Sequence, residues 1–291
     1  MINNNLLSMS DREKISGEAN RLRHMCGIDN VLSGVPVGKN IEHLLDALNI
    51  TLIRLPVDSN NTAENKETQH RPFQGMSVKL DKGGQQNHYI VINTNNYYDD
   101  QIFYIAHELY HYLENGSTDI SRKIWETHDM REEKADYFAA ELLLPENRFK
   151  EAFMDEFGSG NGSDESDTTM MRFIALMQCE WFVPYKAIIR RMEECCLSTD
   201  KMRSHLYCDI DERDQNGEYW RIANAIDEAS FKILNTITMA KGTDPKSLDI
   251  ILRNYDDELI DIDEAEDCLK LFDKKLEDYG YEAEELSDDR E

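Results

Sequence analysis

The chain has 291 residues, and its 58 Asp and Glu against 32 Lys and Arg give a formal net charge of −26. So acidic a surface repels a phosphate backbone, which argues against direct binding of nucleic acid. Since it shows no apolar run of the roughly 20 residues that span a bilayer, no secretory signal and no cysteine framework, we expect a cytoplasmic protein with reduced thiols and no membrane contact.

The N-terminal part predicts two helices followed by a small sheet. Apolar residues spaced by three and four favour helices over residues 10–26 and 40–49. A short strand is predicted at residues 50–56. Residues 73–80 and 88–93 are predicted to pair as a hairpin across an Asp-Lys-Gly-Gly turn. Strands followed by helices indicate the α+β class.

The next predicted helix, residues 98–113, carries the motif His107-Glu108-Leu109-Tyr110-His111. Residues four apart on a helix lie about 40° apart around its axis, so both imidazoles face the same point. Glu108 lies about 100° from His107 and about 60° from His111, close enough to reach a water held between them. Two imidazoles beside a carboxylate are typical of a zinc hydrolase, with two metal ligands and a general base.

The helix predicted over residues 130–144 offers a third ligand. Glu132 and Asp136 lie on the flank of its buried face, whereas Glu133 turns toward solvent. We predict Glu132 as the third zinc ligand, with Glu133 as the alternative, and Asp136 as the acceptor that orients a ligand imidazole. A capping box with Asp129 at the N-cap is another explanation for Glu132, and it is partly compatible with the first.

Two further predictions concern the substrate. His128 lies one turn before the third ligand, where it could donate a hydrogen bond to the transition-state oxyanion, and the alternative is an ordinary loop histidine. The strand at residues 88–93 is expected to bind an extended substrate segment as an added strand, through Tyr89, Val91 and Asn93.

Several of these segments together resemble the ImmA/IrrE family of metallopeptidases over about residues 10–195. They are His107-Glu-Leu-x-His111, the strand-like residues 89–93 before it, and the run Glu132-x-x-Ala135-Asp136-x-Phe138-Ala139-x-x-Leu142-Leu143-x-Pro145. Phe73-Gln-Gly75 is similar to the family's small turn before the strand, and residues 176–197 are similar to its closing helix pair.

The family has a gluzincin-like zinc core, and its characterised members cleave helix-turn-helix repressors inside bacteria. The resemblance therefore implies a zincin-like core, in which a small sheet packs on the motif helix, one Zn²⁺ per chain, and a regulator as substrate. Tyr110 stands where the family usually has Gly, and Asn115 where it often has a further His. Both departures bear on substrate fit rather than on metal binding.

The last third of the chain shows no functional motif. Asn216-Gly217, flanked by residues 205–211 and 218–223, predicts a hairpin. Three stretches after it are predicted to be helical: residues 225–241, 246–255 and 261–279. We thus predict a metallopeptidase domain over residues 1–197 with a closing helical segment, and an acidic C-terminal module of unknown role over residues 198–291.

The charge is concentrated at the C-terminus. Residues 255–291 hold 17 Asp and Glu against 4 Lys and Arg, a net charge of −13. Such a tail attracts a basic partner. DNA-binding repressors are basic on the surface that touches phosphate, so they are candidates. The alternative is a solvated tail that only aids solubility.

The sequence as a whole predicts a zinc-dependent endopeptidase that hydrolyses one bond in a basic helix-turn-helix repressor. The alternative is an interaction or sensing module whose zinc core docks a regulator without efficient proteolysis, against which the intact Glu108 argues. A third hypothesis, DNA binding through residues 171–192 with Lys186, Arg190 and Arg191 exposed, is weakened by the overall charge.

Overall fold

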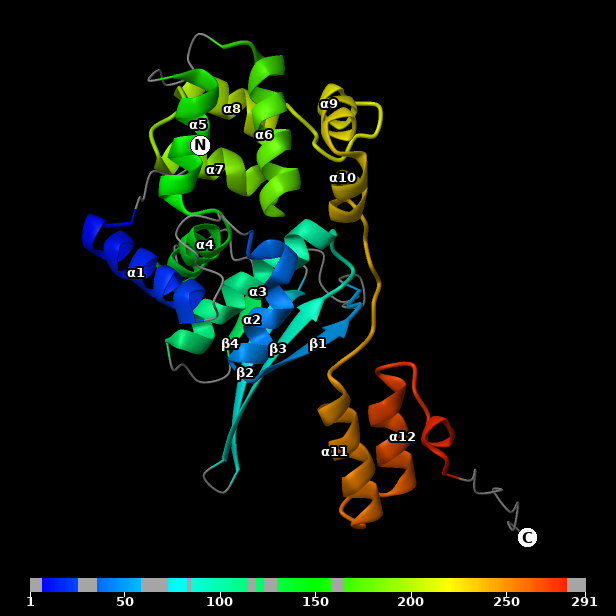
Figure 1. Ribbon diagram of the computed structural model, residues 1–291. Helices are drawn as coiled ribbons and strands as arrows, with labels where there is room; N and C mark the ends of the chain where they lie inside the picture. The colour runs from blue at the N-terminus through cyan, green and yellow to red at the C-terminus, as the bar shows by residue number, and fades with distance from the viewer. Residues whose placement is uncertain are drawn as a thin grey trace, which may run out of the picture.

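The computed structural model describes residues 7–25, 36–58, 73–82, 85–114, 119–122, 130–158 and 165–281 (Figure 1). The strands are β1 (Ile50–Leu55), β2 (Phe73–Lys82), β3 (Gln85–Asn93) and β4 (Asp119–Arg122). The helices of the sheet region are α1 (Met9–Met25), η1 (Gly38–Asn40), α2 (Ile41–Ala47), α3 (Tyr98–Leu113) and α4 (Met130–Leu143). The later helices are α5 (Glu146–Phe157), α6 (Asp167–Trp181), α7 (Tyr185–Glu194), α8 (Asp200–Cys208), α9 (Glu218–Ile226), α10 (Glu228–Leu234), α11 (Pro245–Asp256), α12 (Ile262–Lys270) and η2 (Leu276–Tyr279). The predicted α+β class is confirmed.

A single mixed sheet with strand order β1-β3-β2-β4 supports the first half of the chain. β1 runs parallel to β3, whereas β2 runs antiparallel to both β3 and β4. Because Lys82 pairs with Gln85 at the tip of β2 and β3, the predicted hairpin is confirmed, with strands longer than expected. Phe73 and Gly75 lie inside β2 rather than in a turn, at an irregularity in its pairing with β4.

The central position of β3 overturns one prediction about substrate binding. Tyr89 pairs with Thr51 of β1 on one side and with Val78 of β2 on the other, and Val91 is flanked in the same way. Both backbone edges of β3 are therefore used, and no substrate strand can be added there. The prediction that Tyr89, Val91 and Asn93 bind substrate is wrong, because it took β3 for an edge strand.

Helix α3 lies between the sheet and α4, with contacts to β2 and β3 on one side and to α4 on the other (Figure 1). Its apolar residues repeat at helical spacing and are buried: Ile102, Ile105, Ala106 and Leu109. Helix α1 packs on α4 from outside. The motif helix is thus enclosed along most of its length, which fixes the direction of the polar side chains that it carries.

The predicted hairpin around Asn216-Gly217 is absent from the described residues, and helices α8 and α9 stand in its place. Gly217 is the N-cap of α9 with φ −69°, so it lacks the positive φ that the expected turn requires. Tyr219 and Ala223 are buried four residues apart, as are Met202 and Leu206 in α8. Apolar burial with a period of four favours helices and overrides the local turn signal.

Residues 235–244 form an extended connector that joins α10 to α11, although residues 235–241 were predicted to continue a helix (Figure 1). Arg54 in β1 and Gly242 exchange backbone hydrogen bonds of 2.8 and 3.1 Å. The amide of Met239 donates to the carbonyl of Thr94 at 3.0 Å. The connector contains three threonines and an isoleucine, whose β-branched side chains favour extended backbone, and the sheet region supplies its hydrogen-bond partners.

Two apolar clusters divide the described chain. The larger runs from Leu7 to Leu234 and joins α8, α9 and α10 to the sheet region and to α6. The smaller is built around Ala265, Leu269 and Leu276 in the C-terminal helical pair. Within the described residues, no helix combines the length and the apolar character needed to cross a bilayer.

Candidate metal centre

The motif residues lie in the C-terminal half of α3, and Glu132 lies in the first turn of α4. The Nε2 atoms of His107 and His111 lie 3.2 Å apart. Glu132 presents Oε2 to Nε2 of His107 at 3.1 Å and Oε1 to Nε2 of His111 at 3.3 Å. Two ring nitrogens and a carboxylate thus converge on one point, as helical spacing predicts for the two histidines.

These separations fit a metal ion. Ligand atoms held ~2.0–2.1 Å from one tetrahedral ion lie about 3.3 Å from each other. The separations among His107, His111 and Glu132 are close to that edge length. These three residues form the one cluster of His, Cys, Asp or Glu with metal-ligand spacing among the described residues. Imidazole nitrogens with one carboxylate oxygen suit Zn²⁺ and related divalent ions.

Burial shows from which side the centre opens. The side chains of His107 and His111 are 4% and 1% exposed, whereas that of Glu132 is 30% exposed. A ligand or water can therefore approach past Glu132, while α3 and the sheet close the opposite side. An open position beside three protein ligands distinguishes catalytic zinc sites from structural ones.

Asp136 lies one turn after Glu132 and takes the place predicted for it. Its Oδ1 accepts a hydrogen bond from Nδ1 of His107 at 2.9 Å. With the proton on Nδ1, Nε2 of His107 keeps its lone pair directed at the centre. Oδ2 of Asp136 accepts from Nη1 of Arg190 at 2.8 Å.

The charges around the centre favour a cation. Burial by itself lowers the pKa of His107, but hydrogen bonds to Asp136 and Glu132 outweigh it and raise that pKa to about 10. Burial raises the pKa of Glu132, and hydrogen bonds from the two imidazoles outweigh it and lower that pKa to about 2. The carboxylates of Glu132 and Asp136 thus favour positive charge at this point.

Glu108 is fully buried and lies against the backbone of β2. A Cβ atom added at Gly75 would lie 3.2 Å from Oε1 of Glu108 and 3.1 Å from the carbonyl oxygen of Val91. Gly75 therefore leaves the room in which the Glu108 carboxylate sits. Sequence reasoning missed this contact, although a glycine inside a strand pattern is itself a signal of close backbone approach.

The other predicted residues have different places. His128, Asp129 and Asn115 lie outside the described residues. The donor cluster includes Glu132 and not Glu133. Asn93 is 1% exposed, and its amide group bonds the backbone of Val57 and Phe73.

Tyr110 turns away from the centre. Its ring lies 5.6 Å from that of Phe138, and its hydroxyl donates to Glu114 at 2.9 Å. Both contacts are made on the flank of α3, so Tyr110 is a packing residue.

A small sheet, a helix with the HExxH motif and an acidic residue from the next helix define the class of HExxH metallopeptidase domains. Residues 45–159 match the model of the family described as Peptidase_M78, IrrE N-terminal-like domain. This segment of the chain therefore belongs to the ImmA/IrrE family of metallopeptidases, as its motifs predicted. No curated protein matches the chain. The matched segment contains β1 to α5, and thus all three metal-binding candidates.

Proposed function

We propose that the protein is a zinc-dependent endopeptidase that cuts one protein partner, a basic helix-turn-helix regulator. The observation that carries the proposal is the convergence of His107, His111 and Glu132 on one point, next to a buried glutamate in the same motif. The buried glutamate, Glu108, is not one of the three ligands. A structural zinc site would instead be closed by a fourth protein ligand, usually a cysteine or a histidine, and would need no such carboxylate.

His107, His111 and Glu132 would hold the ion, which when bound supplies a Lewis acid and lowers the pKa of water toward neutrality. Glu108 would accept the proton of the attacking water at its carboxylate and deliver it to the leaving amine. Asp136, whose Oδ1 lies 2.9 Å from Nδ1 of His107, would keep the His107 ring in the tautomer that offers Nε2 to the centre. His128 stays a candidate for donating a hydrogen bond to the oxyanion.

Because β3 lies inside the sheet, an extended substrate segment can pair only with one of the edge strands, β1 or β4. The outer edge of β1 is partly occupied by the connector, through Arg54 and Gly242. Among the described residues, no strand pairs with the outer edge of β4. We propose that an extended segment of the partner pairs with the outer edge of β4 as an added strand. β4 pairs with β2 at Gly75, and Gly75 packs against the carboxylate of Glu108.

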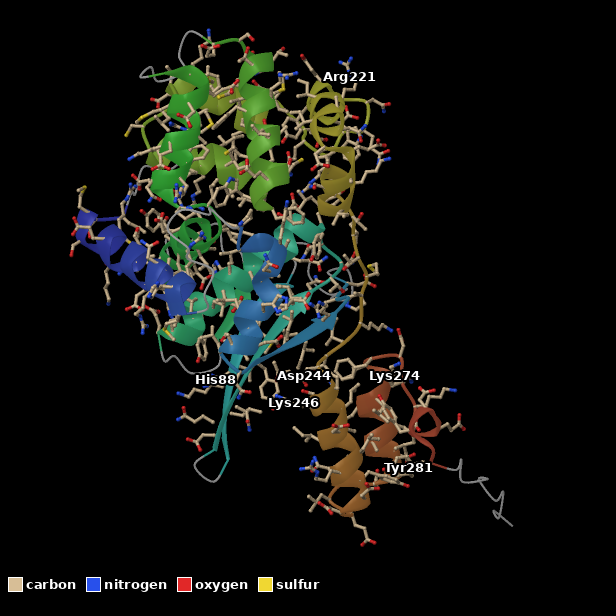
Figure 2. All side chains as sticks on the ribbon, viewed as in Figure 1. His88, Arg221, Asp244, Lys246, Lys274 and Tyr281 are labelled. Atoms are coloured by element: carbon tan, nitrogen blue, oxygen red, sulfur yellow. The ribbon has the colours of Figure 1, made fainter. Side chains whose placement is uncertain are left out.

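The proposed partner is basic because residues 255–291, which include α12, hold 17 Asp and Glu against 4 Lys and Arg. Side chains of α12 project into solvent (Figure 2). Exposed charges of one sign act mainly on the rate of encounter with an oppositely charged partner. The five cysteines within the described residues are free thiols, which supports our proposal of a cytoplasmic location.

Glu108→Gln separates proteolysis from docking. The amide is nearly isosteric but cannot accept the proton, so cleavage should slow by roughly 10²- to 10⁴-fold while zinc content stays at the parent level. The substrates to use are small helix-turn-helix proteins encoded beside the gene, followed by intact mass spectrometry. Parent-like cleavage by Glu108→Gln would contradict the mechanism, and a partner bound but left uncut by both proteins would favour the docking alternative.

A further inference from the structure

Helix α7 lies beyond the segment matched by the family model, and two adjacent arginines connect it to α4. Arg191 is buried, with a side chain 1% exposed, and its Nη1 lies 3.1 Å from Oε2 of Glu141 on α4. The same nitrogen lies 3.1 Å from Oε2 of Glu194. A buried charge pair of this kind tolerates little displacement, because its polar atoms have no water to turn to. Arg191 thus fixes the position of α7 along α4.

The register set by Arg191 places its neighbour at the metal centre. Nη1 of Arg190 lies 2.8 Å from Oδ2 of Asp136, and Oδ1 of the same carboxylate lies 2.9 Å from Nδ1 of His107. Each carboxylate oxygen therefore has its own donor, one from α7 and one from α3. The side chain of Arg190 is 46% exposed, so the contact is made at the rim of the centre and not in the core.

A carboxylate held at only one oxygen can rotate about its last torsion, and the imidazole bonded to it can tilt with it. Two donors on its two oxygens remove that freedom, and a charged donor forms the stronger bond. The direction of Nε2 of His107 depends on the same ring plane. The orientation of a metal ligand on α3 is therefore set from α7.

We propose that Arg190 is a positioning residue of the metal centre, which acts through Asp136 on His107. The inference rests on the proposed function in one respect only, that the centre binds a metal ion. It makes α7 a part of the centre, although the family match ends at residue 159. Loss of an outer hydrogen-bond partner typically lowers metal affinity by ~10- to 100-fold, and we expect about tenfold for Arg190→Ala, since it acts one bond further out.

The test is a competition titration of the full-length protein with Zn²⁺ against a chromophoric chelator. Arg190→Ala should bind zinc about tenfold more weakly than the parent, and Arg190→Lys should recover part of the loss, because lysine keeps the charge but not the planar donor group. The matched control is Lys186→Ala, which removes another exposed cation of α7 that faces Glu212 at 3.6 Å. It should bind zinc like the parent.

A double-mutant cycle separates a positioning role from a general structural one. If Arg190 acts through Asp136, Arg190→Ala should cost no further affinity in an Asp136→Ala background. The absorption spectrum of the Co²⁺-loaded protein should change in Arg190→Ala and stay unchanged in Lys186→Ala. Should Arg190→Ala fail to fold, Arg190→Gln, which keeps most of the stem, carries the same comparison.

The outcomes are distinct. A parent protein that binds no metal would overturn the proposed function, and this inference with it. A parent that binds zinc, with an Arg190→Ala variant of equal affinity and equal Co²⁺ spectrum, would overturn the role of Arg190 alone. Equal losses in the parent and Asp136→Ala backgrounds would also overturn it, because Arg190 would then act by another route.

Discussion

Helices α3 and α11 are both amphipathic, yet the protein holds them by different forces. Ten residues of α3 are buried, including both motif histidines and Glu108. In α11 not one of its 12 residues is buried, as judged within the described part of the chain. The comparison shows that the candidate metal centre is carried by helices locked into the larger core, whereas half of the net acidic charge lies in residues 255–291, from the end of α11 onward, where the larger core makes few contacts.

In the C-terminal helical pair, α11 and α12, hydrogen bonds at the helix ends supply part of the stabilisation that burial supplies in the larger core. Asp244 caps α11 by accepting from the amide of Ser247, and it also accepts from the hydroxyl of Thr51 in β1 at 3.0 Å (Figure 2). Asp261 and Glu264 form a capping box at the start of α12. Caps of this kind contribute ~1 kcal/mol each, enough to start a helix but not to hold a site in place.

The contrast predicts different effects for the same substitution in the two regions. Leu142→Ala empties a fully buried position of α4 and should cost ~2–5 kcal/mol of unfolding free energy. Leu252→Ala in α11 removes a partly exposed side chain of the smaller cluster. Trp181 lies in the larger cluster and Trp220 packs against it, and residues 245–291 contain no tryptophan, so denaturation followed by tryptophan fluorescence reports the larger core rather than the C-terminal pair. A shift for Leu252→Ala as large as that for Leu142→Ala would show that both regions unfold as one unit.

A smaller effect is expected where the core touches Glu108, the proposed general base. Gly75→Ala places a methyl group 3.2 Å from Oε1 of Glu108 and should displace that carboxylate by a few tenths of an ångström. We expect cleavage to slow by about tenfold, since misplacement by about 1 Å costs ~10²-fold, with zinc content unchanged. Gly17→Ala is the matched control, because an added Cβ there has nothing within 4 Å. Parent-like activity of Gly75→Ala would contradict a role for the close approach of Gly75 in positioning the Glu108 carboxylate.

The smallest effect should come from the C-terminal pair. Deleting residues 245–291 keeps the connector and removes α11, α12 and the whole acidic tail of residues 255–291. If the charge steers a basic partner, stopped-flow association should slow several-fold at low salt and converge with the parent at high salt. Cleavage of a short neutral peptide should not change. Identical association rates at low salt would leave the tail a role in solubility only.

The sequence predicted the two helices of the centre because their signals are local. His107 and His111 lie four residues apart, and the apolar spacing of residues 130–144 fixed the flank on which Glu132 and Asp136 lie. Sheet order is a non-local property, so the sequence alone did not show that β3 is enclosed by β1 and β2. It also did not show the contact between Arg190 and Asp136, which are 54 residues apart.

The turn signal at Asn216-Gly217 failed for a related reason. Tyr219, two residues after it, packs its ring 4.5 Å from that of Tyr185 on α7 and donates its hydroxyl to Gln178 on α6. These contacts with distant segments stabilise a helix where the local signal indicates a hairpin. Tertiary packing therefore decided the structure of this region.

The central claim, that α3 and α4 together build a metal centre, is tested most directly by metal analysis of purified variants of neighbouring glutamates. The parent and Glu133→Ala should each contain one zinc ion per chain, whereas Glu132→Ala should lose it, as should His107→Ala and His111→Ala. Glu133→Ala controls for the loss of a charge at the same end of α4. Full zinc in Glu132→Ala together with its loss in Glu133→Ala would contradict the ligand set, and a parent protein without metal affinity would contradict the centre itself.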